Sequence, residues 1–329
     1  MSHAREQGKI SSMQAYLIDT SVPEKLVQRE TADPTPLPNE ILVSVRATSL
    51  NRGEIRMALE TGYYPDGYIP GWDVAGIVEQ GAANGQSPQV GDRVVGFVRK
   101  GAWAEKVAVP LEYAAKIPDG VSFAQAATLP VAGLTALHAL YKGGNLLGQQ
   151  VLVTGATGGV GDFAIQLARL SGAIVTAHIR RESQRPLMEQ AGADHIAVGH
   201  SLHEAAHGLG PFNLVIESVG GETLAEVLGL LTERSVVVLF GTSGGHKVTF
   251  DAAKFYSFSG AQLYGLTMPE ELKWVESGTI GLGKLCYAIE RGQLKPQISV
   301  QESWPELPRV AHDLLNRKFT GKAVIQMDS

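Results

Sequence analysis

The sequence contains a single cysteine, Cys286, among 329 residues. A disulfide within the chain is therefore excluded, and the apolar residues around it at helical spacing (Leu282, Leu285, Tyr287, Ile289) predict a buried, inert thiol. Long apolar runs are also missing, so we expect neither a signal peptide nor a membrane span, and the cytoplasm is the default location. No basic run stands out, and 28 basic against 33 acidic residues give a net charge of −5. This balance argues against a nucleic-acid partner.

What the sequence does have is a glycine-rich turn between two apolar segments. Residues 151–153 resemble a short buried strand, and the apolar residues after the turn recur at helical spacing. Ala156, Gly158 and Gly161 fill the three small-residue positions of a dinucleotide-binding turn: one permits the turn, one lets the backbone approach a pyrophosphate, and one lets the helix pack on the strand. The N–H groups at the helix N-terminus would then face the phosphates. A purely structural turn is the alternative. The candidate cofactor-binding residues here are Gly155, Ala156, Thr157, Gly158, Gly159, Val160 and Gly161.

The end of the next predicted strand, at residues 173–177, indicates which dinucleotide would bind. An NAD-selective site usually carries an Asp or Glu about 20 residues beyond the glycines, where it binds the ribose 2′-hydroxyl. This sequence has Arg180 and Arg181 there, and no acidic residue before Glu182. Planar guanidinium groups suit a 2′-phosphate, because they can bind it bidentately. The sequence therefore favours NADPH over NADH, and two arginines in a solvated loop are the alternative.

The hydrophobic pattern changes near Ser122 and divides the chain into two domains. Before this point short strands separated by turns dominate, at 14–18, 40–47, 74–79, 93–98 and 102–109. After it, helical segments alternate with continuous apolar strands at 151–153, 174–177, 214–216 and 236–240, which is typical of a doubly wound parallel sheet. The last residues are expected to rejoin the first domain, with strands at 297–300 and 323–326 and a helix near 310–315. The predicted fold class is α/β.

Several segments together resemble the medium-chain dehydrogenase/reductases, and among them the zinc-free quinone oxidoreductases related to zeta-crystallin. The matching segments are 47–51, 70–78, 90–94, 132–137, the glycine-rich turn, 218–221 and 321–324. The resemblance implies a GroES-like β domain at 13–120, completed by 293–329, and a Rossmann domain at 121–292 that holds NADPH. The active site would lie in the cleft between them. The resemblance also implies a homodimer in which the Rossmann sheets pair at an edge strand near 261–266.

The resemblance further suggests roles for individual residues. Asn51 and Tyr64 match positions near the nicotinamide and the substrate, and Thr135 matches a position that contacts the nicotinamide region. Trp72 departs from the family, in which a small residue is commoner, and its bulk would narrow the acceptor pocket. A loop close to the cofactor is matched by Phe240, Gly241, Thr242 and Ser243.

Zinc ligands are missing from the places where zinc-dependent relatives carry them. Those enzymes need a Cys near Asn51, a His-Glu pair where this chain has Trp72-Asp73, and four clustered cysteines for a structural zinc. His203 and His207 lie in a polar, helix-like stretch, and their spacing would put both on one helix face, as in a metal pair. No third ligand is apparent, so a solvated surface is favoured and we predict no metal site.

Without zinc, nothing in the sequence would polarise a carbonyl strongly. Hydride transfer then suits an acceptor that is already electron-poor, such as a quinone or an α,β-unsaturated carbonyl. Tyr64 is the candidate proton donor or orienter, since a phenol with an ordinary pKa of about 10 is protonated at neutral pH. Equally, Tyr63 and Tyr64 could only line the pocket as an aromatic surface, with no role in proton transfer. Asn51 could hydrogen-bond the acceptor oxygen or the ribose, or it could be an ordinary turn residue.

The leading hypothesis is therefore an NADPH-dependent quinone or enone reductase that acts on a small molecule. An enoyl-thioester reductase would share the fold and the hydride chemistry. It would also need a long channel and a basic patch for a carrier or coenzyme A phosphate, and no clear patch is visible in the sequence. An NADPH-binding protein with a structural or regulatory role is the alternative from a different class.

Overall fold

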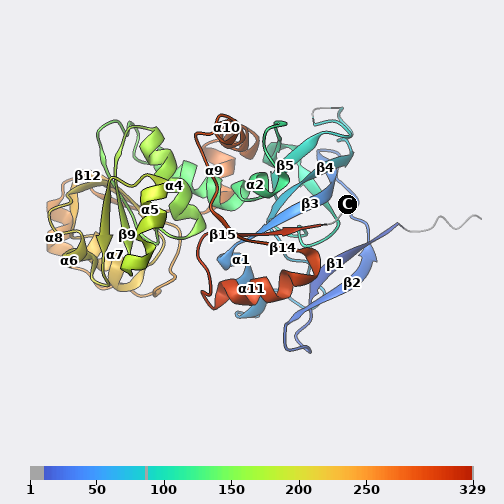
Figure 1. Cartoon of the computed structure of the whole chain (residues 1–329), viewed down its shortest axis with the longest axis horizontal. Helices are drawn as coiled ribbons and strands as arrows, with labels where there is room; N and C mark the ends of the chain where they lie inside the picture. Colours follow the sequence, from blue (N-terminus) through green and yellow to red (C-terminus); the bar gives the residue numbers. More distant parts are fainter. Residues whose placement is uncertain (1–10, 86–87, 328–329) are drawn as a thin grey trace, which may run out of the picture.

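The computed structural model describes residues 11–85 and 88–327, which form two main sheets with helices around them. Figure 1 shows the two sheets toward opposite ends of the long axis, with α2 (Phe123–Ala127), α9 (Met268–Trp274) and α10 (Gly278–Glu290) between them. One buried apolar cluster runs through this middle layer. It includes Phe97 from one sheet, Val153 from the other and Leu285 of α10. The two sheets are therefore packed through a common core.

The seven-stranded sheet is built from both ends of the described chain. Its strands run in the order β14-β15-β3-β4-β5-β7, with β6 also paired to β3, while β1 and β2 form a separate antiparallel pair. Because β15 pairs antiparallel with β3, the last strands complete a sheet that the first residues begin. The elements of this part are β1 (Ser12–Ile18), β2 (Leu26–Ala32), β3 (Glu40–Leu50), α1 (Arg52–Leu59), β4 (Asp73–Gln80), β5 (Arg93–Phe97), β6 (Lys106–Pro110), β7 (Ala114–Lys116), β14 (Ile298–Ser303), α11 (Leu307–Leu315) and β15 (Lys322–Gln326).

The six-stranded sheet is parallel throughout and has the order β10-β9-β8-β11-β12-β13. Its strands are apolar runs with helices between them, because both faces of a parallel sheet are covered. A π-helical turn (Leu129–Gly133) leads from α2 into the first of these helices. The remaining elements are α3 (Leu134–Tyr141), β8 (Gln150–Val153), α4 (Gly159–Leu170), β9 (Ile174–Ile179), α5 (Arg185–Ala191), β10 (His195–Val198), α6 (Leu202–Ala205), β11 (Phe212–Glu217), α7 (Gly221–Val227), β12 (Leu231–Leu239), α8 (Ala252–Ser257) and β13 (Gln262–Gly265).

The predicted strand at 102–109 is wrong in its first half, because β6 begins only at Lys106. The chain turns at Gly101, whose φ of +94° lies in the left-handed region. The backbone N–H of Trp103 then donates to the carbonyl of Pro70 instead of to a neighbouring strand. Ala104 makes only an isolated bridge to Ala15. This segment is apolar because it is buried against the 69–71 loop, and such burial produces the same hydrophobic pattern as a strand.

Candidate active site

The glycine-rich turn lies between β8 and α4, at the carboxyl edge of the six-stranded sheet. β8 has β9 on one side and β11 on the other, so the turn lies where the strand order reverses, which is where open α/β sheets bind their ligands. A Cβ on Gly161 would lie 2.6–2.7 Å from backbone atoms of Ala156 and Gly155. Only glycine therefore lets α4 pack this closely on the turn.

The first residue of the turn also has to be glycine. Gly155 has a φ of +57°, and a Cβ there would lie 2.3 Å from Oγ of Ser218. Gly158 is the N-cap of α4 and has no side chain that could occupy the space in front of the helix N-terminus. These features leave the backbone bare where a pyrophosphate would approach, so the turn fits a dinucleotide.

The end of β9 carries the two predicted arginines into the exposed loop that follows. Arg180 and Arg181 are both exposed, and neither forms an ion pair within residues 11–85 and 88–327. By contrast, the neighbouring Arg185 is held by Glu182. A guanidinium nitrogen of Arg180 lies 3.9 Å from the position that a Cβ on Gly244 would occupy. Arg180 thus faces the loop after β12.

That loop, residues 240–243, is held at the same edge of the sheet. The backbone N–H and the hydroxyl of Ser243 both donate to the carbonyl of Ser218, at 3.3 and 3.1 Å. A Cβ on Gly241 would lie 2.8 Å from that same carbonyl oxygen. The structure therefore brings the loops after β8, β9, β11 and β12 together. Thr135 is buried in the first turn of α3.

Asn51 caps α1 and lies in a buried polar network. Its side-chain nitrogen donates to Oδ2 of Asp73 at 2.8 Å and to Oε1 of Glu54 at 3.2 Å. Its side-chain oxygen accepts a 2.6 Å hydrogen bond from the ammonium of Lys322. Both amide hydrogens of Asn51 are thus used inside the protein, and an acceptor oxygen could gain one only by displacing a carboxylate.

The remaining contacts of this network indicate which of its groups are charged. Asp73 accepts the backbone N–H of Val131 on its other oxygen at 2.9 Å, and Lys322 also donates to the carbonyl of Leu50 at 3.1 Å. Burial pushes the pKa of Asp73 up and that of Lys322 down, and the opposite charge of each partner counters the shift of the other. Because Asp73 only accepts and Lys322 only donates, we assign them as an ion pair.

The segment around Lys322 joins the two halves of the site. The N–H of Gly321 donates to the carbonyl of Thr157 at 2.9 Å. The stem of Lys322 packs so closely on the glycine-rich turn that a Cβ on Gly159 would lie 2.4 Å from its Cδ. Arg317 reaches the other cofactor-side loop, where it donates to the carbonyl of Ser243 at 2.7 Å.

Tyr64 lies in the loop after α1, in an aromatic group. Its ring stacks on Tyr68 with 4.0 Å between ring centroids and an interplanar angle of 7°, and Tyr63 packs edge-on against it. The hydroxyl lies 4.0 Å from the sulfur of Met57. Burial raises the pKa of Tyr64 above its ordinary value, so the phenol keeps its proton at neutral pH.

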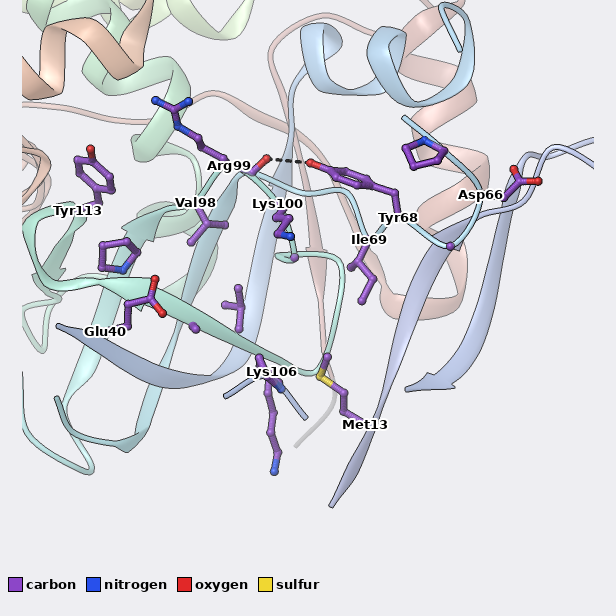
Figure 2. A pocket seen from close by; sticks show the side chains of 17 residues that line it. Met13, Glu40, Asp66, Tyr68, Ile69, Val98, Arg99, Lys100, Lys106 and Tyr113 are labelled. Carbon is purple, nitrogen blue, oxygen red and sulfur yellow. Dashed lines mark hydrogen bonds between the residues drawn. The ribbon is translucent and has the colours of Figure 1, made fainter. Parts of the chain in front are cut away.

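A cavity of about 750 Å³ opens next to this aromatic group, away from the glycine-rich turn. Figure 2 shows Tyr68 at its edge, donating through its hydroxyl to the carbonyl of Arg99 at 3.2 Å, with Met13, Ile69 and Val98 along the wall. Because Tyr68 stacks on Tyr64, the cavity and the environment of Tyr64 share a wall. No residue of the glycine-rich turn lines the cavity.

His203 and His207, whose spacing would put both on one face of a continuous helix, do not lie on one helix. Residues 203–207 have the sequence His-Glu-Ala-Ala-His, a zinc-binding pattern when it lies on one continuous helix. However, α6 ends at Ala205, and the N–H of His207 turns back to the carbonyl of Glu204. Within the described residues no group of three or more potential metal ligands comes together. None of the helices there has the length and apolar character needed to cross a bilayer.

The sequence reasoning missed Glu54, and it used Asp73 and Lys322 only as members of motifs. A signal for two of them was present: Asp73 opens the apolar strand β4, and Lys322 opens the apolar strand β15. A charged residue at the start of a buried strand needs a buried partner. The sequence does not show which partner it has, since Glu54, Asp73 and Lys322 come from three separate elements, α1, β4 and β15.

Two domain families match the chain. Residues 37–119 match the alcohol dehydrogenase GroES-like domain, and residues 159–277 match the zinc-binding dehydrogenase family. The chain belongs to the medium-chain dehydrogenase/reductase superfamily and is quinone oxidoreductase-like. The predicted α/β fold, a GroES-like domain with a Rossmann parallel sheet, is confirmed. Enzymes of this superfamily are oxidoreductases that generally bind a nicotinamide dinucleotide.

Similar proteins have several activities. The quinone oxidoreductase from Coxiella burnetii is 25% identical, with a TM-score of 0.81 over 97% of this chain and 100% of that one. The CurK enoyl reductase shares the fold at 23% identity, with a TM-score of 0.80 over 96% of this chain and 99% of that one. A phthioceranic/hydroxyphthioceranic acid synthase of Mycobacterium tuberculosis is 30% identical over 309 residues. That match includes 89% of this chain but only 14% of the synthase.

Proposed function

We propose that this protein uses NADPH to reduce a quinone or an α,β-unsaturated carbonyl by hydride transfer without zinc. The observation that carries the proposal is the environment of Asp73. Zinc-dependent relatives place a metal-binding pair where this chain has Trp72 and Asp73. Trp72 offers no metal-ligating atom, and the oxygens of Asp73 are engaged by Asn51 and Val131. Within residues 11–85 and 88–327 these two positions do not offer the donor pair of a catalytic zinc, which supports an electron-poor acceptor that needs no zinc.

The residues at the carboxyl edge of the six-stranded sheet would hold the cofactor. The turn at 155–161 offers bare backbone and a helix N-terminus for the pyrophosphate, and Arg180 and Arg181 offer free guanidinium groups for a 2′-phosphate. Thr135 and residues 240–243 would bound the nicotinamide side. When bound, NADPH supplies the hydride.

On the acceptor side the chain supplies position and a proton. We assign the acceptor contact to Tyr64, whose phenol is protonated at neutral pH and can donate to a developing oxyanion. Asn51 acts by fixing the start of α1, because both its amide hydrogens are already donated within the protein. The half-buried ring of Trp72 limits the size of the acceptor beside Gly53, whose Cβ position lies 3.7 Å from that ring.

The test is oxidation of NADPH and NADH by the purified protein with 1,4-benzoquinone, 9,10-phenanthrenequinone and a simple enone, together with metal analysis of the same sample. We expect turnover with NADPH that survives chelation and does not scale with zinc content. If NADPH binds tightly but no acceptor is reduced, the reductase proposal fails and a structural or regulatory NADPH-binding role takes its place.

An enoyl-thioester reductase is the second candidate, favoured by the match of nearly the whole chain to part of an acid synthase. This candidate predicts that a crotonyl or longer enoyl thioester is reduced with a higher kcat/KM than any quinone. A preference for the quinones would reject it.

We also propose a homodimer, located in the cytoplasm. Strand β13 lies at the edge of the six-stranded sheet and, in the described part of the chain, pairs only with β12. Its Leu263 is 46% exposed. An apolar edge strand of this kind is a liability unless another strand covers it, and a second copy would do so.

A further inference from the structure

The buried network around Asn51 contains a carboxyl group that the proposed mechanism does not use. Glu54 lies in the first turn of α1 and is fully buried. Its Oε1 accepts the backbone N–H of Asn51 at 2.7 Å as well as the side-chain nitrogen. Its Oε2 has no partner of good hydrogen-bond geometry among the described residues, and the nearby backbone N–H of Trp72 only partly offsets the effect of burial on the pKa of Glu54. A buried carboxylate with an unpartnered oxygen is costly, whereas a carboxylic acid carries no net charge there.

Charged and titratable groups from β4, from β15 and from the loop after α1 act on the carboxyl group of Glu54. Asp73 of β4 repels a negative charge on Glu54, and Lys322 of β15 attracts it, but the ammonium of Lys322 is bonded to Asn51 and Leu50. A negative charge on Glu54 also raises the pKa of the Tyr64 and Tyr68 hydroxyls. Two carboxyl groups thus share one ammonium, so the network is neutral only if one of them is protonated.

Lys322 connects this network to the cofactor side. Its stem packs on Gly159 and its neighbour Gly321 bonds Thr157, both in the glycine-rich turn, while its ammonium holds Asn51. A shift of the ammonium toward an ionised Glu54 would release Asn51 from it. The helix that carries Glu54 also carries Met57, which Tyr64 contacts.

We propose that Glu54 carries a proton in the active protein. Glu54, Asp73 and Lys322 then act as one positioning network, which holds Asn51 and α1 in a fixed position relative to the glycine-rich turn during hydride transfer. This inference rests on the function proposed above. Burial, with the neighbouring Asp73 carboxyl, raises the pKa of Glu54 to about 8, which agrees with a protonated group at neutral pH.

The first test is the pH dependence of kcat in Glu54→Gln, which copies the protonated acid. For the wild type we expect kcat to fall as pH rises through about 8, because Glu54 then ionises. In Glu54→Gln this fall should be absent, with kcat at pH 7 lowered by no more than about threefold, a cost of under about 0.7 kcal/mol. Glu60→Gln, at the exposed C-terminal end of the same helix, is the matched control and should keep the wild-type profile. The same alkaline fall in Glu54→Gln, or a folded variant without turnover, would overturn the inference.

The second test separates positioning from simple structural support. Lys322→Met keeps the stem against Gly159 but leaves Asp73 unpaired. We expect at least about a tenfold loss of kcat with the KM for NADPH changed by less than about threefold. Adding Asp73→Asn should restore part of the lost kcat, because the unpaired charge is removed. Equal losses in the single and double variants would contradict a shared network.

A stability measurement keeps the test independent of the acceptor. The pKa of Glu54 is higher in the folded protein than the ordinary 4.5, so the folded state binds this proton more tightly. The proton on Glu54 therefore stabilises the folded state fully below about pH 4.5, and this contribution to the free energy of unfolding is lost as pH rises toward about 8. The thermal midpoint of the wild type should fall relative to Glu54→Gln across that window and no further above it. A constant difference would reject a protonated Glu54 even if no quinone is reduced, and the expected fall would support it even if the proposed reaction fails.

Discussion

The ammonium of Lys322 donates a 2.6 Å hydrogen bond to the side-chain oxygen of Asn51, which lies 271 positions earlier in the chain. This bond joins the start of β15 to the N-cap of α1. Because the stem of Lys322 also packs on Gly159, one side chain contacts both the acceptor half and the cofactor half of the candidate site. The relative position of the two halves therefore depends on a residue from the last described strand.

The choice of cofactor should depend on Arg180 and Arg181. Replacing both with Ala should lower kcat/KM for NADPH by about 100-fold or more, because each of the two charge-assisted contacts to a 2′-phosphate contributes about 1.5–3 kcal/mol. NADH, which lacks that phosphate, should lose little. Steady-state kinetics with both cofactors would measure this.

Arg185→Ala is the matched control, since Arg185 is already paired with Glu182. It should leave the cofactor preference unchanged. Equal use of NADH and NADPH by the wild type would contradict the role assigned to Arg180 and Arg181.

Replacing Tyr64 with Phe removes the hydroxyl and keeps the ring that stacks on Tyr68. If Tyr64 donates a proton to the acceptor, kcat with a quinone should fall at least about tenfold while cofactor binding is unchanged. Single-turnover kinetics would isolate the chemical step. Tyr63→Phe, at a ring that is 68% exposed, should have no such effect. A loss below about twofold in Tyr64→Phe would mean that the ring only walls the pocket.

Gly161→Ala should destabilise the fold, because its Cβ would lie within 2.7 Å of the backbone of Ala156. Overpacking of this kind typically costs about 1–3 kcal/mol, measured by denaturant unfolding. Gly283→Ala in α10 is the control: a Cβ there meets nothing within 4 Å, so the change should stabilise the helix by about 0.5–1 kcal/mol. A neutral Gly161→Ala would show that α4 can move away from the turn.

The single thiol should be unreactive in the folded protein. Cys286 is buried in α10, and burial raises its pKa to about 12. At pH 8 only about one thiol in 10,000 is then ionised, whereas the thiolate is the reactive form. Iodoacetamide should therefore label the native protein far more slowly than the protein in denaturant, as followed by mass spectrometry. Rapid native labelling would place Cys286 in an accessible site.

The dimer should depend on Leu263 in the edge strand β13. Leu263→Lys places a charge in that edge, a substitution that natural sheets use to prevent pairing. We expect light scattering to show a dimer for the wild type and a monomer for this variant. Leu147→Lys, at a residue that is 72% exposed elsewhere, should remain a dimer. A wild-type monomer would refute the assembly.

The sequence by itself determined the elements and the class of the fold. The apolar run 151–153, the small residues after it and the helical spacing beyond them predict β8, the turn and α4, because these signals are local. Alternation of such units requires a parallel sheet, and a helical apolar pattern around Cys286 places it in a core. The segment at 102–109 shows the limit of this reasoning, since burial against the 69–71 loop gave the same apolar signal as a strand.

The tertiary structure alone decided how the site is connected. Asn51, Glu54, Asp73 and Lys322 come from β4, β15 and the region where β3 meets α1, and the pairing of β3 with both β4 and β15 brings them together. The same holds for the end of α6, which separates His203 from His207. Periodicity depends on neighbours three or four residues apart, whereas a buried charge is satisfied by whichever strand the fold places beside it. For this reason the sequence predicts the glycine-rich turn, whereas only the packed structure shows that the stem of Lys322 contacts it.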